Sequence, residues 1–127
     1  MASNAQYAAT PLSPAVIVNT ANPNRNGTGT VVQLLPASPT GCRVDDINIQ
    51  AQVTTTAGMV RIFAKRGANY FLLREIPVAA VVPSATERAY SIQLTNLAWV
   101  FDTTTELYAS TEKAEAIAIT VTHGGSL

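Results

Sequence analysis

The segment Ile47-Asn48-Ile49-Gln50-Ala51-Gln52-Val53-Thr54 decides the fold class of this chain. Apolar and polar side chains alternate along it without a break, which is the pattern of a strand with one buried and one solvent-facing side. The segment Ile117-Ala118-Ile119-Thr120-Val121-Thr122 repeats this pattern near the other end of the sequence. Together the two segments predict a β-sheet that places one face against a hydrophobic core.

Similar segments, separated by turns rich in Gly, Pro, Asn and Thr, fill most of the chain beyond residue 27. We expect strands near residues 29–35, 42–54, 58–66, 69–80, 87–94, 97–101, 105–111 and 115–123. A spacing of about 8 to 12 residues is typical of a sandwich or a barrel. The short break at Gly67-Ala68-Asn69 predicts a hairpin. Residues 112–116 have helical propensity but form too short a stretch for a helix. We therefore predict an all-β fold, a single antiparallel β-sandwich.

The composition favours a protein that works by contact with partners. The 127 residues can close one core, and only 13% of them are charged, against about 25% in ordinary soluble domains. Threonine, present 16 times, supplies many of the polar positions and allows hydroxyl contacts without charge repulsion between packed copies. Eight basic and eight acidic residues cancel, so no long-range field draws the chain to nucleic acid or to an anionic membrane.

Cysteine usage and hydropathy indicate where the protein is made. The single cysteine cannot form an intrachain disulfide, and the N-terminus has no signal-peptide pattern. No window approaches the roughly 18 apolar residues of a membrane span. We expect synthesis in a reducing cytoplasm and no integral membrane segment.

The first 27 residues differ from the rest, because three prolines stand among small and polar side chains. A turn-rich stretch at residues 22–27 marks a boundary, so we expect an extended N-terminal arm over residues 1–27 and a β-sandwich domain over residues 28–127. Only one short patch of the arm, centred on Val16, Ile17 and Val18, is apolar.

Two interpretations of this patch remain open. Val16, Ile17 and Val18 could be partner-binding residues that add a strand to a neighbouring subunit, since proline keeps such an arm extended. Alternatively, they could form an N-terminal edge strand of their own domain.

Metal and phosphate sites have little support in the sequence. Asp45 and Asp46 could contribute to a calcium site, but no spaced acidic loop accompanies them, and we interpret them as solvated charge where a strand begins. His123 has no cysteine or second histidine with which to share a metal. The stretch Gly27-Thr28-Gly29 leads into valines rather than a helix, which predicts a turn rather than a phosphate loop. We expect no metal and no cofactor.

Catalytic groups have equally little support in the sequence. Cys42 would need a base beside it to act as a nucleophile, and nothing in the sequence places His123 there, so we expect a semi-buried thiol. Glu106, Glu112 and Glu115 lie within ten residues and could in principle serve glycoside hydrolysis, but exposed loop charge is the simpler interpretation. We predict that the protein is not an enzyme.

The aromatic residues have two interpretations. Trp99, Phe101 and Tyr90 could form a platform for a sugar or a base, or they could be large anchors of the core, which we favour in a chain with few aromatics. A carbohydrate-binding module that uses Trp99, Tyr90 or Tyr108 is therefore an alternative function.

Several strings of strand and turn residues, at 27–32, 41–47, 54–63 and 73–78, carry a family resemblance, as does the closing run 116–125. They resemble a family of small structural proteins of tailed bacteriophages, and the resemblance covers roughly residues 22–127. Some similar proteins act as capsid decoration or cement proteins. These strings are scaffold residues, so no functional residue is carried over.

The resemblance implies a jelly-roll-like sandwich on the outer capsid surface of a virion, made in the cytoplasm of the host bacterium. Its partners would be the major capsid protein and further copies of the chain in a homo-oligomer, with a trimer expected at three-fold positions. No direct contact with nucleic acid or a membrane is expected. The alternative within the virion is a neck, tail or head-fibre component.

Overall fold

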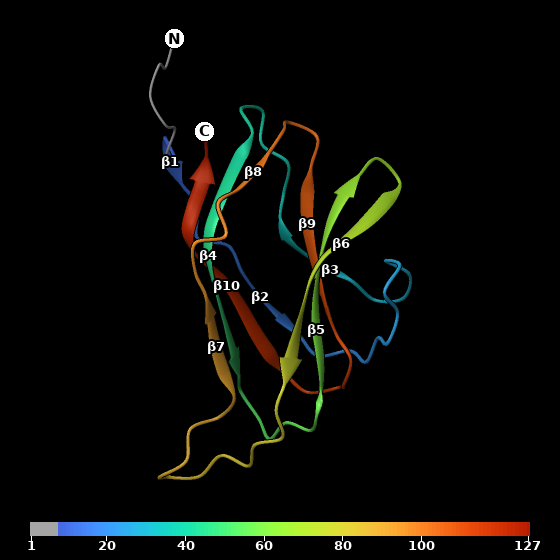
Figure 1. Cartoon of the computed structure of the whole chain (residues 1–127), viewed down its shortest axis with the longest axis vertical. Coiled ribbons are helices and arrows are strands. Elements are labelled where there is room, and N and C mark those ends of the chain that lie inside the picture. The colour runs from blue at the N-terminus through green and yellow to red at the C-terminus, as the bar shows by residue number, and fades with distance from the viewer. Residues whose placement is uncertain (1–7) are drawn as a thin grey trace.

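The computed structural model describes residues 8–127 as two packed β-sheets, with no helix in that range (Figure 1). Sheet A contains β1 (Thr10–Pro11), β2 (Ala15–Val18), β4 (Cys42–Ala51), β7 (Ser91–Leu94), β8 (Trp99–Phe101) and β10 (Ile117–Ser126). Sheet B contains β3 (Val32–Leu35), β5 (Gly58–Arg66), β6 (Asn69–Val78) and β9 (Glu106–Thr111). The predicted all-β sandwich is confirmed, and a strand lies in each of the eight expected ranges.

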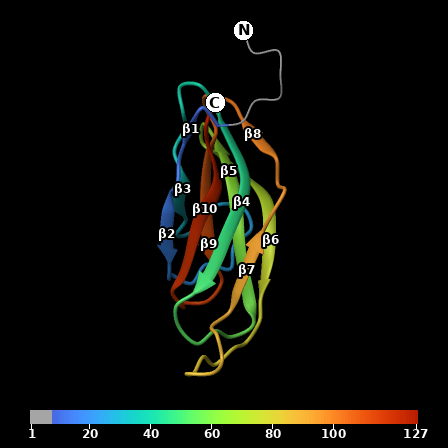
Figure 2. The same ribbon diagram turned by 90° about the vertical axis from the view of Figure 1, so that its left-hand side faces the viewer.

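The strands pair in a nested order, and every pair is antiparallel. β2 pairs with β10, β3 with β9, β4 with β7 and β5 with β6. Sheet A therefore has the order β2-β10-β4-β7, and sheet B the order β3-β9-β5-β6. Figure 2 shows β10 and β4 side by side in the middle of sheet A, between β2 and β7. The two segments with the clearest alternation thus form the centre of the same sheet.

The core between the sheets is built on that alternation. Ile47 and Ile49 of β4 and Ile119 of β10 are completely buried. The alternation ends earlier than the sequence suggests, because β4 stops at Ala51 and Val53 beyond it is 41% exposed.

The predicted hairpin joins β5 to β6. Arg66 pairs with Asn69, which leaves Gly67 and Ala68 as the two loop residues. Gly67 has a φ of +60° whereas Ala68 does not have a positive φ. A positive φ at the first loop residue alone is the pattern of a type II′ turn, which matches the twist of the two strands.

Residues 19–31, which connect β2 to β3, form a cover over part of the outer face of sheet B. Arg61 and Phe63 of β5 lie outside the core cluster, yet both are completely buried. Asn22 in the cover is 2% exposed, and its side-chain amide donates to the carbonyls of Thr28 and Thr30. β5 is thus buried on both faces, which the sequence did not indicate.

Arg61 is the largest fully buried side chain and ties this cover to the sheet. Its guanidinium donates to Glu75 at 2.9 Å, to Glu112 at 2.8 Å and to the carbonyl of Asn22 at 3.4 Å. Arg25, in the cover, donates to the same Glu75 at 2.7 Å. A buried charge is tolerated only when it is paired and hydrogen-bonded, and these contacts meet that condition.

Acid is expected to loosen the cover. Hydrogen bonds from Arg25 and Arg61 lower the pKa of Glu75, and the hydrogen bond from Arg61 lowers the pKa of Glu112. A carboxyl group whose pKa is lowered in the folded protein stabilises the fold at pH values above its pKa in the unfolded chain, here 4.5. This stabilisation is lost as the pH falls through the pKa of the group in the folded protein. We expect the thermal midpoint to fall with pH below about 5, with amides 22–30 exchanging hydrogen first.

The control for this prediction compares two exchanges of Glu for Gln. Glu75→Gln should flatten the pH dependence, whereas Glu87→Gln, at an exposed position outside the network, should leave it unchanged. An equal pH dependence in wild type and Glu75→Gln would contradict the role given to this carboxylate.

Candidate interaction surface on sheet A

The predicted partner-binding residues lie in β2, at the edge of the chain's own sheet. β2 pairs along its whole length with β10, from Val18 opposite Ile117 to Ala15 opposite Thr120. β1 pairs with the other end of β10. The single chain therefore has the edge strand that the sequence left open as an alternative. Residues 1–7 of the predicted arm lie outside the described residues.

Two rows of side chains on the outer face of sheet A next to β2 are entirely uncharged. Directly opposite residues of paired strands share a face, so the strand register defines rows across the sheet. One row contains Ile17, Ala118, Gln50 and Ser91, and the next contains Ala15, Thr120, Asn48 and Gln93. The amide of Gln93 donates to the hydroxyl of Thr122 at 2.9 Å. We call these two rows the neutral face.

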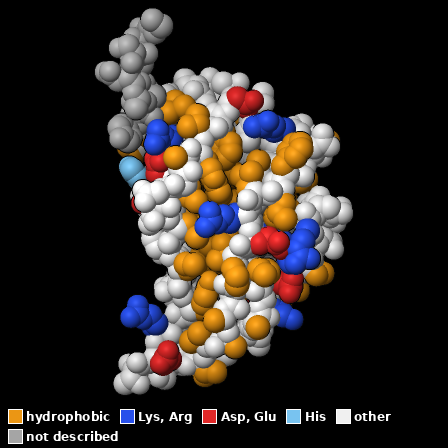
Figure 3. Space-filling model, in the orientation of Figure 1, with side chains coloured by type: hydrophobic (Ala, Val, Ile, Leu, Met, Phe, Trp, Pro, Cys, Tyr) orange, Lys and Arg blue, Asp and Glu red, His pale blue; other side chains and the backbone are white. Residues whose placement is uncertain are grey.

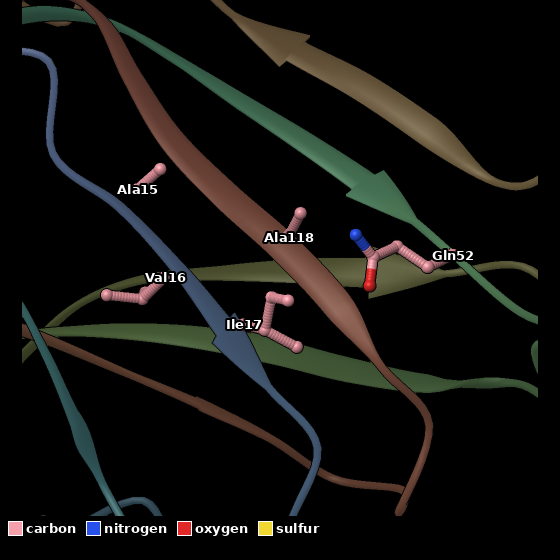
Figure 4. Close-up of a pocket in the computed structure, with 5 residues that line it drawn as sticks. All are labelled: Ala15, Val16, Ile17, Gln52 and Ala118. Atoms are coloured by element: carbon pink, nitrogen blue, oxygen red, sulfur yellow. The ribbon is translucent and has the colours of Figure 1, made fainter.

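A shallow groove of about 450 Å³ lies where β2 meets the neutral face (Figure 4). It is lined by Ala15, Val16, Ile17, Gln52 and Ala118. The small side chain of Ala118 on β10 leaves room between β2 and Gln52, which lies just beyond the end of β4. The groove can hold an apolar side chain of a partner. The side-chain amide of Gln52 can form a hydrogen bond with a nearby polar atom of the same partner.

The structure separates the three predicted partner-binding residues. Ile17 is 52% exposed and lines the groove together with Val16. Val18 is 1% exposed, and its side chain lies in the core. Val16 is opposite the buried Ile119 and packs partly against the core, so a partner on the outer face at this edge would contact mainly Ile17 and not Val18.

The possible metal ligands form a small polar cluster on β4 and β10. Asp45 is buried and accepts two contacts of 3.0 and 3.1 Å from the guanidinium of Arg43. Nδ1 of His123 lies 3.8 Å from Asp45. The prediction that Asp45 is a solvated charge at the start of a strand is therefore wrong. Asp45 and Asp46 both lie within β4, and Asp45 is buried and paired with Arg43. Among residues 8–127 no group of three or more His, Cys, Asp or Glu side chains could hold a metal ion.

The possible catalytic groups are placed apart. Cys42 is 1% exposed rather than half-buried, and burial raises the pKa of its thiol. Glu106, Glu112 and Glu115 each accept hydrogen bonds from a different partner, namely Gln33, Arg61 and Thr56. These interactions fix each carboxylate in a separate structural role.

The aromatic residues mainly support the core. Phe101 is 8% exposed, and Trp99 and Tyr90 pack against the core from partly exposed positions. The hydroxyl of Tyr90 donates to the carbonyl of Pro77 and so links the connection after β6 to sheet B. Burial raises the pKa of Tyr90. The favoured interpretation as core anchors holds for Phe101 and in part for the other two.

A second aromatic cluster, on the outer face of sheet B, was not expected from the sequence. The rings of Tyr70 and Tyr108 meet edge to face, 5.5 Å apart, and Nζ of Lys65 lies 5.5 Å from both ring centroids. Gly27, with a φ of +85°, packs tightly against Tyr70. A Cβ on Gly27 would lie 2.3 Å from that side chain, so the predicted turn at Gly27 also needs a residue without a side chain.

No helix within residues 8–127 is long and apolar enough to cross a membrane. Comparison of the chain with family models, with curated proteins and with solved structures gives no match in any of the three.

Proposed function

We propose that this protein is a structural component of a tailed-bacteriophage virion, a capsid decoration or cement protein that stabilises contacts between major capsid subunits. The observation that carries this proposal is the neutral face, which lies on a sandwich with nested strand pairing. The nested pairs β2 with β10, β3 with β9, β4 with β7 and β5 with β6 support a jelly-roll-like form. Jelly rolls are common in viral capsid proteins and also in lectins.

The chemistry of the neutral face suits packing between identical copies. Threonine, asparagine and glutamine side chains form hydrogen bonds without bringing like charges together, and the groove beside Ile17 adds an apolar contact. Each weak contact is multiplied in a closed ring, because every copy repeats it. In this proposal the neutral face joins copies within a homo-oligomer, with a trimer as the expected form, on the outer shell.

The copy number per particle tests the proposal. We would image particles of the virus by cryo-electron microscopy and measure the ratio of this chain to the major capsid protein on a quantitative gel. Hundreds of copies at local three-fold positions are expected. A few copies at one vertex would instead identify a neck, tail or head-fibre component, and complete absence from the particle would overturn a virion role.

A charge on the neutral face should block assembly. Ala118→Asp places a carboxylate beside the groove, where a packed neighbour would have to desolvate it, and we expect at least about tenfold fewer copies per particle. Ala85→Asp, at an exposed position in the connection from β6 to β7, is the matched control and should leave the copy number unchanged. Equal incorporation of both variants would show that the neutral face is not a contact surface in the assembly.

A further inference from the structure

One side of the sandwich is open to solvent. On β6, Phe71 pairs with Ala64 and Arg74 pairs with Ile62, and both of these β5 residues belong to the core. Directly opposite residues share a face, so Phe71 and Arg74 point toward the inside of the sandwich. Nevertheless, Phe71 is 51% exposed and Arg74 is also exposed. Sheet A does not cover this part of β6.

Sheet A shows the same feature on the same side. Ile92 of β7 pairs with Ile49, a core residue, and so points inward, yet it is 37% exposed. β2 contacts β3 and β9 at one side of the sandwich, so the edges formed by β6 and by β7 and β8 lie together at the other side. Figure 3 shows hydrophobic side chains gathered along the middle of the molecule, in the region between these edges. We call this region the open edge.

Large exposed hydrophobic residues are concentrated on the strands that border the open edge and on the connection between them. Six of the eight in residues 8–127 belong to β6, β7, β8 or the connection from β6 to β7. They are Phe71, Leu72, Leu73, Val82, Ile92 and Val100. Phe71 and Ile92 face the open edge, whereas Leu72, opposite Phe63, and Val100, opposite Arg43, lie on the outer faces of the strands that border it. An exposed apolar concentration of this kind marks an interaction site.

The backbone of β6 can also take part in binding. β6 is the last strand of sheet B, so one edge of this ten-residue strand has no partner within residues 8–127. Pro77 near its end lacks an N–H, which leaves residues 69–76 as the stretch that another strand can join. The inward side chains of a strand added there would extend over Ile92 and close the open edge.

Charge indicates what kind of segment would be added. Arg74 has no hydrogen bond or ion pair with any residue from 8 to 127, and it lies on the inward side of β6 between the apolar residues Phe71 and Ile76. A guanidinium in such a setting is best satisfied by a carboxylate, which it can contact through two parallel hydrogen bonds. The segment that fits here therefore carries an acidic residue on its apolar side.

A second copy of the chain is poorly suited to supply this carboxylate. Seven of its eight acidic side chains already accept hydrogen bonds within the chain: Asp45, Asp46, Glu75, Asp102, Glu106, Glu112 and Glu115. The remaining one, Glu87, stands next to the exposed Arg88, so a segment that brought this carboxylate to Arg74 would also bring a second positive charge. Charge complementarity thus favours a different protein.

We propose that the open edge binds an extended segment of a different protein, added as a strand beside β6. The segment has apolar residues at alternate positions and an Asp or Glu that faces Arg74. This inference rests on the proposed function, in which the segment belongs to the major capsid protein. The neutral face and the open edge then have separate partners.

The test uses shells assembled from the major capsid protein without this chain. Co-sedimentation gives the affinity of the full-length wild type, of Arg74→Glu and of Phe71→Ser, with Arg88→Glu as the control at an exposed cation outside the open edge. We expect at least about tenfold weaker binding for the first two variants and no change for the control. Hydrogen exchange of amides 69–76 should slow in the bound wild type. Thermal unfolding of each variant verifies that it is folded.

The outcomes separate this inference from the proposed function. If the wild type binds shells but Arg74→Glu and Phe71→Ser bind equally well and amides 69–76 do not change, the inference fails and the proposed function stands. If the wild type does not bind shells, both fail. If the free protein forms an oligomer that Arg74→Glu breaks and Glu87→Arg restores, the occupant is a second copy and the inference is overturned.

Discussion

Arg61→Ala is expected to lower the free energy of unfolding by about 3 to 5 kcal/mol. The side chain is completely buried, so its removal leaves a void on the outer face of sheet B. It also removes the donor shared by Glu75, Glu112 and the carbonyl of Asn22, which together hold residues 19–31 in place. The loss should therefore appear both as lower stability and as faster hydrogen exchange in the cover.

Two further variants separate the charge of Arg61 from its volume. Arg61→Met keeps much of the buried volume without the hydrogen bonds, and it should recover part of the loss. Arg74→Ala makes the same truncation at an exposed position with no partner in residues 8–127, and it should change stability by no more than about 0.5 kcal/mol. Denaturant unfolding measures all three variants. Equal losses for Arg61→Ala and Arg74→Ala would show that the cover does not depend on the network.

Phe63→Ala is expected to cost about 3 to 5 kcal/mol. Phe63 is completely buried although it does not belong to the main core, and its ring meets Tyr70 edge to face at 6.3 Å. The expected loss is that of a large core side chain because the cover and the aromatic cluster form a second apolar layer. A small loss would mean that this layer collapses easily around the void.

Phe71→Ala is the matched control for this prediction. Phe71 lies on the neighbouring strand β6 and is 51% exposed, so the same truncation should cost about 1 kcal/mol or less in the free protein. The ratio of the two losses, measured by denaturant unfolding, reports the burial of Phe63 directly.

The strands were predictable because each needs only local information. Alternation in β4 and β10 and the break at Gly67 depend on neighbouring residues, and all three appear in the structure, although the strand in β4 ends at Ala51 instead of Thr54. β5 shows the limit of this approach. Its buried run from Val60 to Ala64 includes Arg61, which a two-residue period assigns to a wet face. Only the distant residues 19–31, folded over that face, reverse the assignment.

The candidate surfaces were predictable only in part. The short apolar patch at residues 16–18 was expected either to add a strand to a neighbouring subunit or to form an edge strand of its own domain, and in the structure it is an edge strand in which Ile17 lines a groove. The neutral face depends on the order of strands far apart in the sequence, so it was not predictable. The open edge was missed for the same reason. Phe71 has the pattern of a core residue, and its exposure follows from the place of β6 as the last strand of its sheet.

The nested pairing of strands also constrains the time at which the protein can fold. β10, made after the other nine strands, is the central neighbour of β2 and β4, so neither can complete sheet A while β10 is still within the ribosome. Contacts between such distant segments form slowly, because a long loop must close before they contribute. The newly made chain therefore passes through a stage in which β2 and β4 both present unpaired edges. Its yield in the cell should depend on chaperones during that interval.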